Sequence, residues 1–134
     1  MSEVYFNRVF PAMRTAFPME WISVIDAALQ IDIKTFVPGH GFIEDGLQSR
    51  QKLREFQSAI KYIFAEVQRL RDSGKTREEA LQEANWGGYS TWMLSDSQQE
   101  IAINRIYDLL EGKSEDCAEL KESSGSGSCY RRGV

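Results

Sequence analysis

Residues 49–74 read SRQKLREFQSAIKYIFAEVQRLRDSG, and this stretch decides the fold class. Its apolar residues follow one another at intervals of three or four, which places them on one face of an α-helix. They are Leu53, Phe56, Ile60, Ile63, Phe64, Val67 and Leu70. Gly74 stands where the residue that closes a helix is expected. The pattern therefore predicts one long amphipathic helix over residues 49–73.

Two shorter helices are predicted after the long one. A serine or threonine followed three residues later by a glutamate forms a capping box, which marks the start of a helix. Thr76 with Glu79 and Ser97 with Glu100 have this spacing, and an apolar face follows each pair. The predicted helices span residues 76–84 and 97–110. Together with the long helix they make a three-helix C-terminal region.

The end of the chain has a different composition. Residues 113–134 are polar and rich in glycine and serine, which predicts a flexible tail. Both cysteines, Cys117 and Cys129, lie in it, and their spacing fits neither a disulfide framework nor a zinc ribbon. We interpret them as free thiols.

The N-terminal third mixes helical and strand patterns. Apolar residues at helical spacing predict a helix over residues 21–29. Alternation of β-branched with other residues predicts a strand over 31–37, which Pro38 and two glycines end. A short aromatic run predicts a second strand at 4–6. The whole chain is therefore expected to be α+β and mostly helical.

The composition limits the class of protein. Of 134 residues, 42% are hydrophobic and 27% charged, as in a soluble globular domain. The formal net charge of −4 argues against charge-driven binding of nucleic acid. No apolar run reaches the roughly 18 residues that a membrane helix needs, and the N-terminus lacks the pattern of a secretory signal. We expect a cytoplasmic protein with no nucleic-acid or membrane partner.

The single histidine, His40, stands in the segment TFVPGHGFIEDG, residues 35–46. Three roles are open: a metal ligand, a catalytic base, or a polar residue in a turn. Zinc requires three or four nitrogen, sulfur or oxygen ligands at about 2.0–2.3 Å. Glu44 and Asp45 are close in sequence, and Glu3 comes close if its strand lies beside the one before the histidine. One imidazole with carboxylates makes a weak site.

Three stretches suggest a family. VYFNRVFPAM at 4–13, EWISVIDAAL at 20–29 and TFVPGHGF at 35–42, followed by the long helix, resemble the C-terminal part of metallo-β-lactamase-fold hydrolases. The most specific motifs are FNR at 6–8 and PGHG at 38–41, and their order and spacing support each other. The resemblance implies part of an αββα sandwich, with one or two short strands and a helix. It also implies that His40 is the last ligand of a binuclear zinc site.

The resemblance carries over only in part. In the family a metal-bridging aspartate stands where this chain has Glu3, and an HxHxDH motif supplies most other ligands. This chain contains no HxHxDH motif. The resemblance therefore assigns His40 and Glu3 to the metal and assigns no catalytic residue. Zinc in such enzymes acidifies a bound water, but with two ligands we expect weak binding or none, and no meaningful hydrolysis by this chain alone.

This interpretation divides the chain into three segments. Residues 1–48 are the partial metallo-β-lactamase-fold segment, 49–112 the helical region and 113–134 the tail. The expected partner is the missing N-terminal half or a second copy of the chain. The substrate of the parent enzyme stays open, because a fold does not determine a function.

A second interpretation belongs to another class. Three capped amphipathic helices are enough for a small bundle, so the chain is alternatively a non-catalytic helical protein-interaction module. An upstream reading frame that encodes an HxHxDH segment would favour the hydrolase, and its absence would favour the module. The aromatic residues of the stretch 85–94, NWGGYSTWML, either line a substrate entrance or pack between helices.

Overall fold

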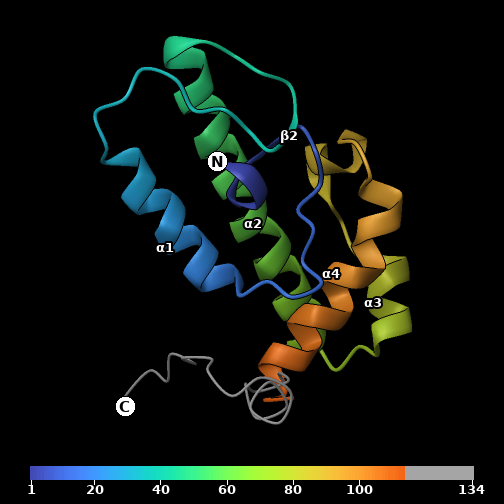
Figure 1. Cartoon of the computed structure of the whole chain (residues 1–134). Coiled ribbons are helices and arrows are strands. Elements are labelled where there is room, and N and C mark those ends of the chain that lie inside the picture. The colour runs from blue at the N-terminus through green and yellow to red at the C-terminus, as the bar shows by residue number, and fades with distance from the viewer. Residues whose placement is uncertain (114–134) are drawn as a thin grey trace, which may run out of the picture.

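The computed structural model describes residues 1–113, and this part of the chain is mostly helical (Figure 1). It contains four α-helices, two short 3₁₀ helices and one two-stranded parallel sheet. In chain order these are η1 (Ser2–Val4), β1 (Phe6–Asn7), α1 (Pro18–Leu29), β2 (His40–Gly41), α2 (Gly46–Asp72), α3 (Arg77–Glu83), η2 (Gly87–Thr91) and α4 (Ser95–Leu110). The expected α+β, mostly helical class is confirmed. The predicted tail, apart from Lys113, lies outside the described residues, as do Cys117 and Cys129.

The long helix α2 is the centre of the structure. Leu53, Phe56, Ile60 and Ile63 are fully buried along its predicted apolar face. α1 packs along one side of α2, and α4 packs along another (Figure 1). α3 packs mainly against α4. The helix begins at Gly46, three residues before the predicted start, and ends at Asp72.

Two predicted helix ends are confirmed. After α2, Gly74 has a φ of +80°, a left-handed conformation that glycine adopts without a steric cost. Its N–H donates to Arg71 O at 2.9 Å, and Lys75 N–H donates to Leu70 O at 3.2 Å, so the last carbonyls of α2 are satisfied. α3 begins with the predicted capping box between Thr76 and Glu79.

The capping box predicted for α4 is wrong. The helix begins at Ser95, after Leu94 in a left-handed conformation with a φ of +62°. Ser97 Oγ donates to Leu94 O at 3.0 Å instead of accepting from the helix. The physical reason is tertiary: Met93 N–H donates to Arg8 O at 3.0 Å, and this pairing sets the course of the chain into α4. The local pattern at Ser97 does not reveal that contact.

The strand predicted over residues 31–37 is also wrong. The observed strand β2 comes later, at the histidine, and the first strand lies at Phe6–Asn7 rather than 4–6. The carbonyls of residues 29–33 instead accept hydrogen bonds from one side chain, the guanidinium of Arg50 on α2. It donates to the carbonyl oxygens of Leu29, Ile31 and Ile33 at 2.7, 3.1 and 3.1 Å.

The alternation in this segment does not mark a strand face. Phe36 is buried, whereas Ile31, Ile33 and Val37 are exposed. Phe36 N–H donates to Ser49 Oγ at 3.0 Å inside the core, and its ring lies under the Arg50 guanidinium at 5.1 Å. A single buried aromatic side chain thus anchors an irregular segment to α2.

One hydrophobic cluster includes side chains from all parts of the described chain. It contains buried residues from the N-terminal segment, α1, α2, α3 and α4. Residues on both sides of the predicted 48/49 division contribute to it, and that division stays a prediction. Within the described residues, no helix combines the length and the apolar character that crossing a membrane requires.

Candidate metal centre

The structure brings the two predicted ligands together. Phe6 of β1 pairs with His40 of β2, and Glu3 in η1 precedes β1. Glu3 Oε1 lies 2.8 Å from His40 Nε2. Both side chains are exposed, 53% for His40 and 72% for Glu3, so an ion from solvent can reach them.

The backbone around the histidine is held from the neighbouring strand. Gly39 N–H donates to Tyr5 O at 2.9 Å. Gly41 has a φ of +93°, and a Cβ there would lie 1.9 Å from Asn7 O. Only glycine permits this close approach of two backbones. The PGHG loop is therefore fixed by protein contacts alone.

Asn7 holds the far side of the loop. Its side chain is buried, and its Nδ2 donates to Phe42 O at 2.6 Å. Arg8, with a φ of +59°, donates from Nη2 to Glu44 Oε1 at 2.8 Å and lies over the Phe42 ring at 5.3 Å. The FNR motif thus acts as a positioning element for the segment after His40. The sequence singled out this motif but did not reveal these partners.

The imidazole itself rests on the core. The Phe6 ring meets the His40 ring edge-on, with centroids 4.9 Å apart. Phe6 in turn packs against Trp21 of α1 and Phe56 of α2. One side of the imidazole is therefore supported by aromatic side chains, which limits its motion.

The other carboxylates considered as ligands have different roles. Glu44 is paired with Arg8, and Asp45 is the N-cap residue of α2. Among residues 1–113, no group of three or more His, Cys, Asp or Glu side chains converges as a metal site would require. Two donors do not fit a complete zinc site, which needs three or four. We therefore derive no catalytic step from these residues.

The distance within the pair supports the same conclusion. Two ligands at about 2.0–2.1 Å from a tetrahedral zinc lie about 3.3 Å from each other. The observed separation of 2.8 Å is that of a hydrogen bond. The side chains must move apart by a few tenths of an ångström to admit an ion. Their exposure makes this movement easy.

Tyr5, the residue directly before β1, has a buried phenol side chain. Tyr5 is fully buried, and within the described part of the chain its hydroxyl has no hydrogen-bond partner. Burial, with a smaller contribution from the carboxylates of Glu44 and Glu55, raises the pKa of Tyr5 to about 12. The hydroxyl therefore stays protonated and neutral at physiological pH.

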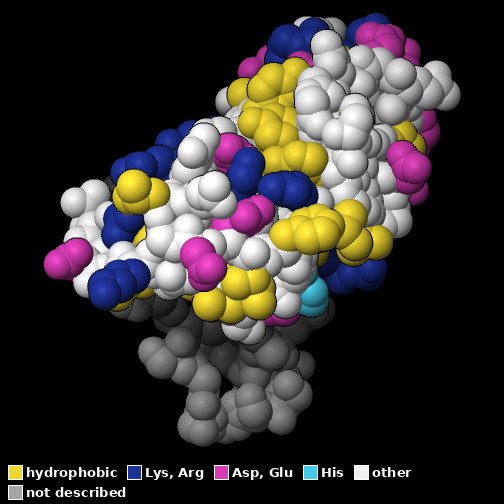
Figure 2. Space-filling view, turned by 90° about the horizontal axis from the view of Figure 1, so that it is seen from above, with side chains coloured by type: hydrophobic (Ala, Val, Ile, Leu, Met, Phe, Trp, Pro, Cys, Tyr) yellow, Lys and Arg dark blue, Asp and Glu magenta, His cyan; other side chains and the backbone are white. Residues whose placement is uncertain are grey.

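Exposed hydrophobic side chains are close to the histidine in sequence. Figure 2 looks onto the end of the molecule that carries β2, where hydrophobic side chains form several patches and the imidazole lies at the edge of the surface in view. Four large apolar side chains of residues 37–47 are exposed, and we call them the β2 apolar segment. They are Val37 at 47%, Phe42 at 48%, Ile43 at 68% and Leu47 at 86%. Such a concentration on a monomer commonly marks an interaction site.

The aromatic residues of the stretch 85–94 serve two purposes. Trp86 is buried and meets Phe10 edge-on at 5.6 Å, so it belongs to the core. Tyr89 packs between Tyr62 and Trp92, with ring centroids at 5.4 and 4.9 Å. These three rings line an open cavity of about 560 Å³.

No protein-family model, curated protein or solved structure matches the chain. The family resemblance therefore rests on the FNR and PGHG motifs and their order. The function is argued below from the geometry of Glu3 and His40.

Proposed function

We propose that this chain carries the C-terminal part of a metal-dependent hydrolase of the metallo-β-lactamase fold, with His40 as one metal ligand and Glu3 as a second. One observation carries the proposal: the carboxylate of Glu3 in η1 lies 2.8 Å from the imidazole of His40 in β2, the strand that pairs with β1. They come from positions 37 residues apart, as the order of the FNR and PGHG motifs requires.

The glycine contacts support this assignment. A metal ligand that is already held in place loses less conformational entropy when it binds the ion. The contacts of Gly39 and Gly41 with the neighbouring backbone hold the loop in place without an ion. The proposed PGHG loop thus keeps its shape in the metal-free protein.

The remaining ligands must come from polypeptide outside residues 1–113. In a complete centre, zinc acidifies a bound water and polarises the scissile bond. Here Glu3 and His40 would hold one side of the metal, and the exposed side chains of the β2 apolar segment are close to His40 in sequence. A covering polypeptide that supplies an HxHxDH motif would bury that segment. This proposal predicts that the described residues alone do not hydrolyse substrates.

Zinc titration followed by NMR tests the assignment. The chain has one histidine, so its ring signals are identified without ambiguity. We expect zinc to shift these signals with micromolar or weaker affinity, since a structural site with four ligands gains about 10 kcal/mol and two ligands gain far less. Glu3→Gln should weaken binding, and Glu44→Gln is the matched control because its carboxylate pairs with Arg8.

Two results would contradict the proposal. Zinc binding that leaves the His40 signals unchanged would show that the imidazole is not a ligand. Equal weakening by Glu3→Gln and Glu44→Gln would show that only overall charge matters. Near-stoichiometric zinc retained after dialysis and lost in His40→Ala would keep His40 as a ligand but refute the expectation of weak binding.

The second candidate function is a non-catalytic helical interaction module. The β2 apolar segment favours it, because Ile43 and Leu47 expose most of their side chains without any metal being involved. The Glu3–His40 contact is then a surface hydrogen bond. An upstream reading frame without HxHxDH, together with a zinc-insensitive His40, would favour this function over the hydrolase.

A further inference from the structure

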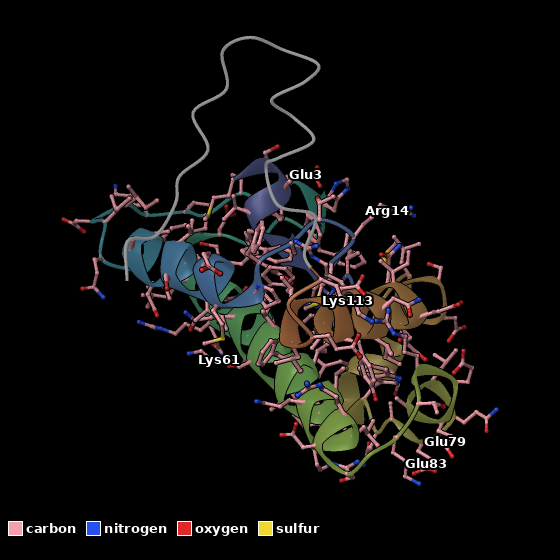
Figure 3. The ribbon with its side chains drawn as sticks, turned by 90° about the horizontal axis from the view of Figure 1, so that it is seen from below. Glu3, Arg14, Lys61, Glu79, Glu83 and Lys113 are labelled. Carbon is pink, nitrogen blue, oxygen red and sulfur yellow. The ribbon has the colours of Figure 1, made fainter. Side chains whose placement is uncertain are left out.

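A second site is suggested by a cavity of about 490 Å³ between the segment before α1 and the C-terminal part of α4. In Figure 3 the labelled Arg14 and Lys113 both lie beside α4, although they come from opposite ends of the described chain. The polar and charged side chains that line the cavity are Arg14, Thr15, Asn104, Arg105, Asp108 and Lys113. None of them belongs to the proposed metal centre.

Arg105 is held in a defined position. Its Nε donates to Ala16 O at 2.8 Å, and its guanidinium lies 4.8 Å from the centroid of the Phe17 ring. Within residues 1–113 the hydrogen bonds of Arg105 use only Nε, so its two terminal nitrogens are available to a ligand. A donor that is already fixed loses little entropy when it binds.

Asn104 is oriented in the same way. Its side-chain oxygen Oδ1 accepts from Arg77 Nη1 at 3.4 Å, which leaves its amide N–H groups as donors. Arg14 is exposed and makes no hydrogen bond or ion pair with any other described residue. The Thr15 hydroxyl adds one more donor at the rim. These side chains offer many donors and few acceptors.

The charge of the cavity is positive. Arg14, Arg105 and Lys113 face one carboxylate, that of Asp108. Asp108 is already neutralised by Arg77, whose Nη2 lies 2.7 Å from Asp108 Oδ1. Lys113 shares Glu111, at 2.8 Å, with the same arginine. The two arginines of the cavity therefore lack a fixed anionic partner within the described residues.

We propose that this cavity binds the phosphate group of a small molecule. Arginine guanidinium forks bind phosphate oxygens through pairs of parallel hydrogen bonds. Arg14 comes from the segment before α1, whereas Asn104 and Arg105 come from α4 and Lys113 follows it. Donors placed on two sides of a cavity suit a tetrahedral dianion better than a planar carboxylate. Ile101, which also lines the cavity, provides an apolar wall for the rest of the ligand.

The test is an NMR titration of the full chain with inorganic phosphate, with the ionic strength kept constant by sodium chloride. We expect saturable shifts at Thr15, Asn104 and Arg105 in the millimolar range. Arg14→Ser should weaken binding about tenfold, the loss of one charge-assisted hydrogen bond. Arg54→Ser is the matched control, because this exposed arginine of α2 does not line the cavity.

Further titrations test whether the site recognises phosphate specifically rather than any anion. Phenyl phosphate should bind more tightly than inorganic phosphate because its ring can contact Ile101. Arg105→Lys should weaken phosphate binding even though the charge is kept, since a lysine lacks the rigid planar fork that bonds Ala16 O with one nitrogen and leaves two others for the ligand. Shifts that do not saturate, equal effects of Arg14→Ser and Arg54→Ser, or succinate binding as tightly as phosphate would each overturn the proposal.

Discussion

Replacing Gly41 with alanine tests whether the loop at His40 depends on backbone contact. Gly41 has a φ of +93°, which alanine rarely adopts, and its added Cβ would lie 1.9 Å from Asn7 O. No flexible side chain can move aside, because the obstacle is the backbone of β1. The two strands must therefore separate.

The expected cost has two parts. The left-handed conformation costs alanine about 1–2 kcal/mol. Separation of the strands weakens the β1–β2 pairing and the Asn7–Phe42 hydrogen bond, each worth about 1 kcal/mol. We expect Gly41→Ala to lower the free energy of unfolding by about 3–4 kcal/mol. That is a large share of the roughly 5–15 kcal/mol that stabilises a domain.

Three other glycines separate the two causes in urea unfolding experiments. Gly74→Ala tests the conformation alone, because φ is +80° and nothing lies within 4 Å of its Cβ; it should cost about 1–2 kcal/mol. Gly39→Ala tests close contact alone, because its Cβ would lie 2.2 Å from Ser2 O and Gly39 does not have a left-handed φ. Gly88→Ala has open space around it and should change stability by less than about 0.5 kcal/mol. A Gly41→Ala protein no less stable than Gly74→Ala would refute the reasoning.

Three further predictions concern Glu66, Tyr5 and the β2 apolar segment. Arg69 hydrogen bonds lower the pKa of Glu66 below its ordinary value of 4.5, so Glu66 stabilises the fold above that pH and less as the pH falls through the lowered pKa. Glu66→Gln should therefore cost about 1 kcal/mol at pH 7 and less near pH 4, measured by urea unfolding; a pH-independent loss would contradict this. Tyr5→Phe removes a buried hydroxyl without a described partner and should leave stability unchanged or raise it by up to about 1 kcal/mol. A clear loss would reveal a hidden partner. The β2 apolar segment predicts concentration-dependent self-association in light scattering, reduced by the double variant Ile43→Ser with Leu47→Ser; a clean monomer at high concentration would count against it.

Local patterns predicted the helices well because their causes are local. The apolar face of α2 and the capping box of Thr76 and Glu79 involve residues within one or two turns of each other. The strand over 31–37 failed because the carbonyls of Ile31 and Ile33 are satisfied by Arg50, a side chain from α2. The spacing of residues in the sequence does not reveal a bond between a distant side chain and a backbone carbonyl. Sequence alternation is evidence for a strand only where a neighbouring strand exists.

The candidate site was likewise predicted only in part. The spacing of the FNR and PGHG motifs brought Glu3 and His40 together in the prediction, and they lie together in the structure. The buried Asn7 and its bond to Phe42 O were not predicted, since the partners are 35 residues apart and one of them is a backbone carbonyl. A chemically distinctive side chain is visible in a sequence, whereas its support is visible only in the fold.

The pairing of the N-terminal segment with the residues before α4 has a consequence for synthesis on the ribosome. Phe10 N–H donates to Met93 O, which follows it by 83 residues. At about 5–20 residues per second, translation takes roughly 4–17 seconds to supply that partner. During this interval Tyr5, Phe6, Val9 and Phe10 have been made before their partner and cannot complete their burial. A nascent chain of this protein thus exposes these apolar side chains to chaperones until α4 is made.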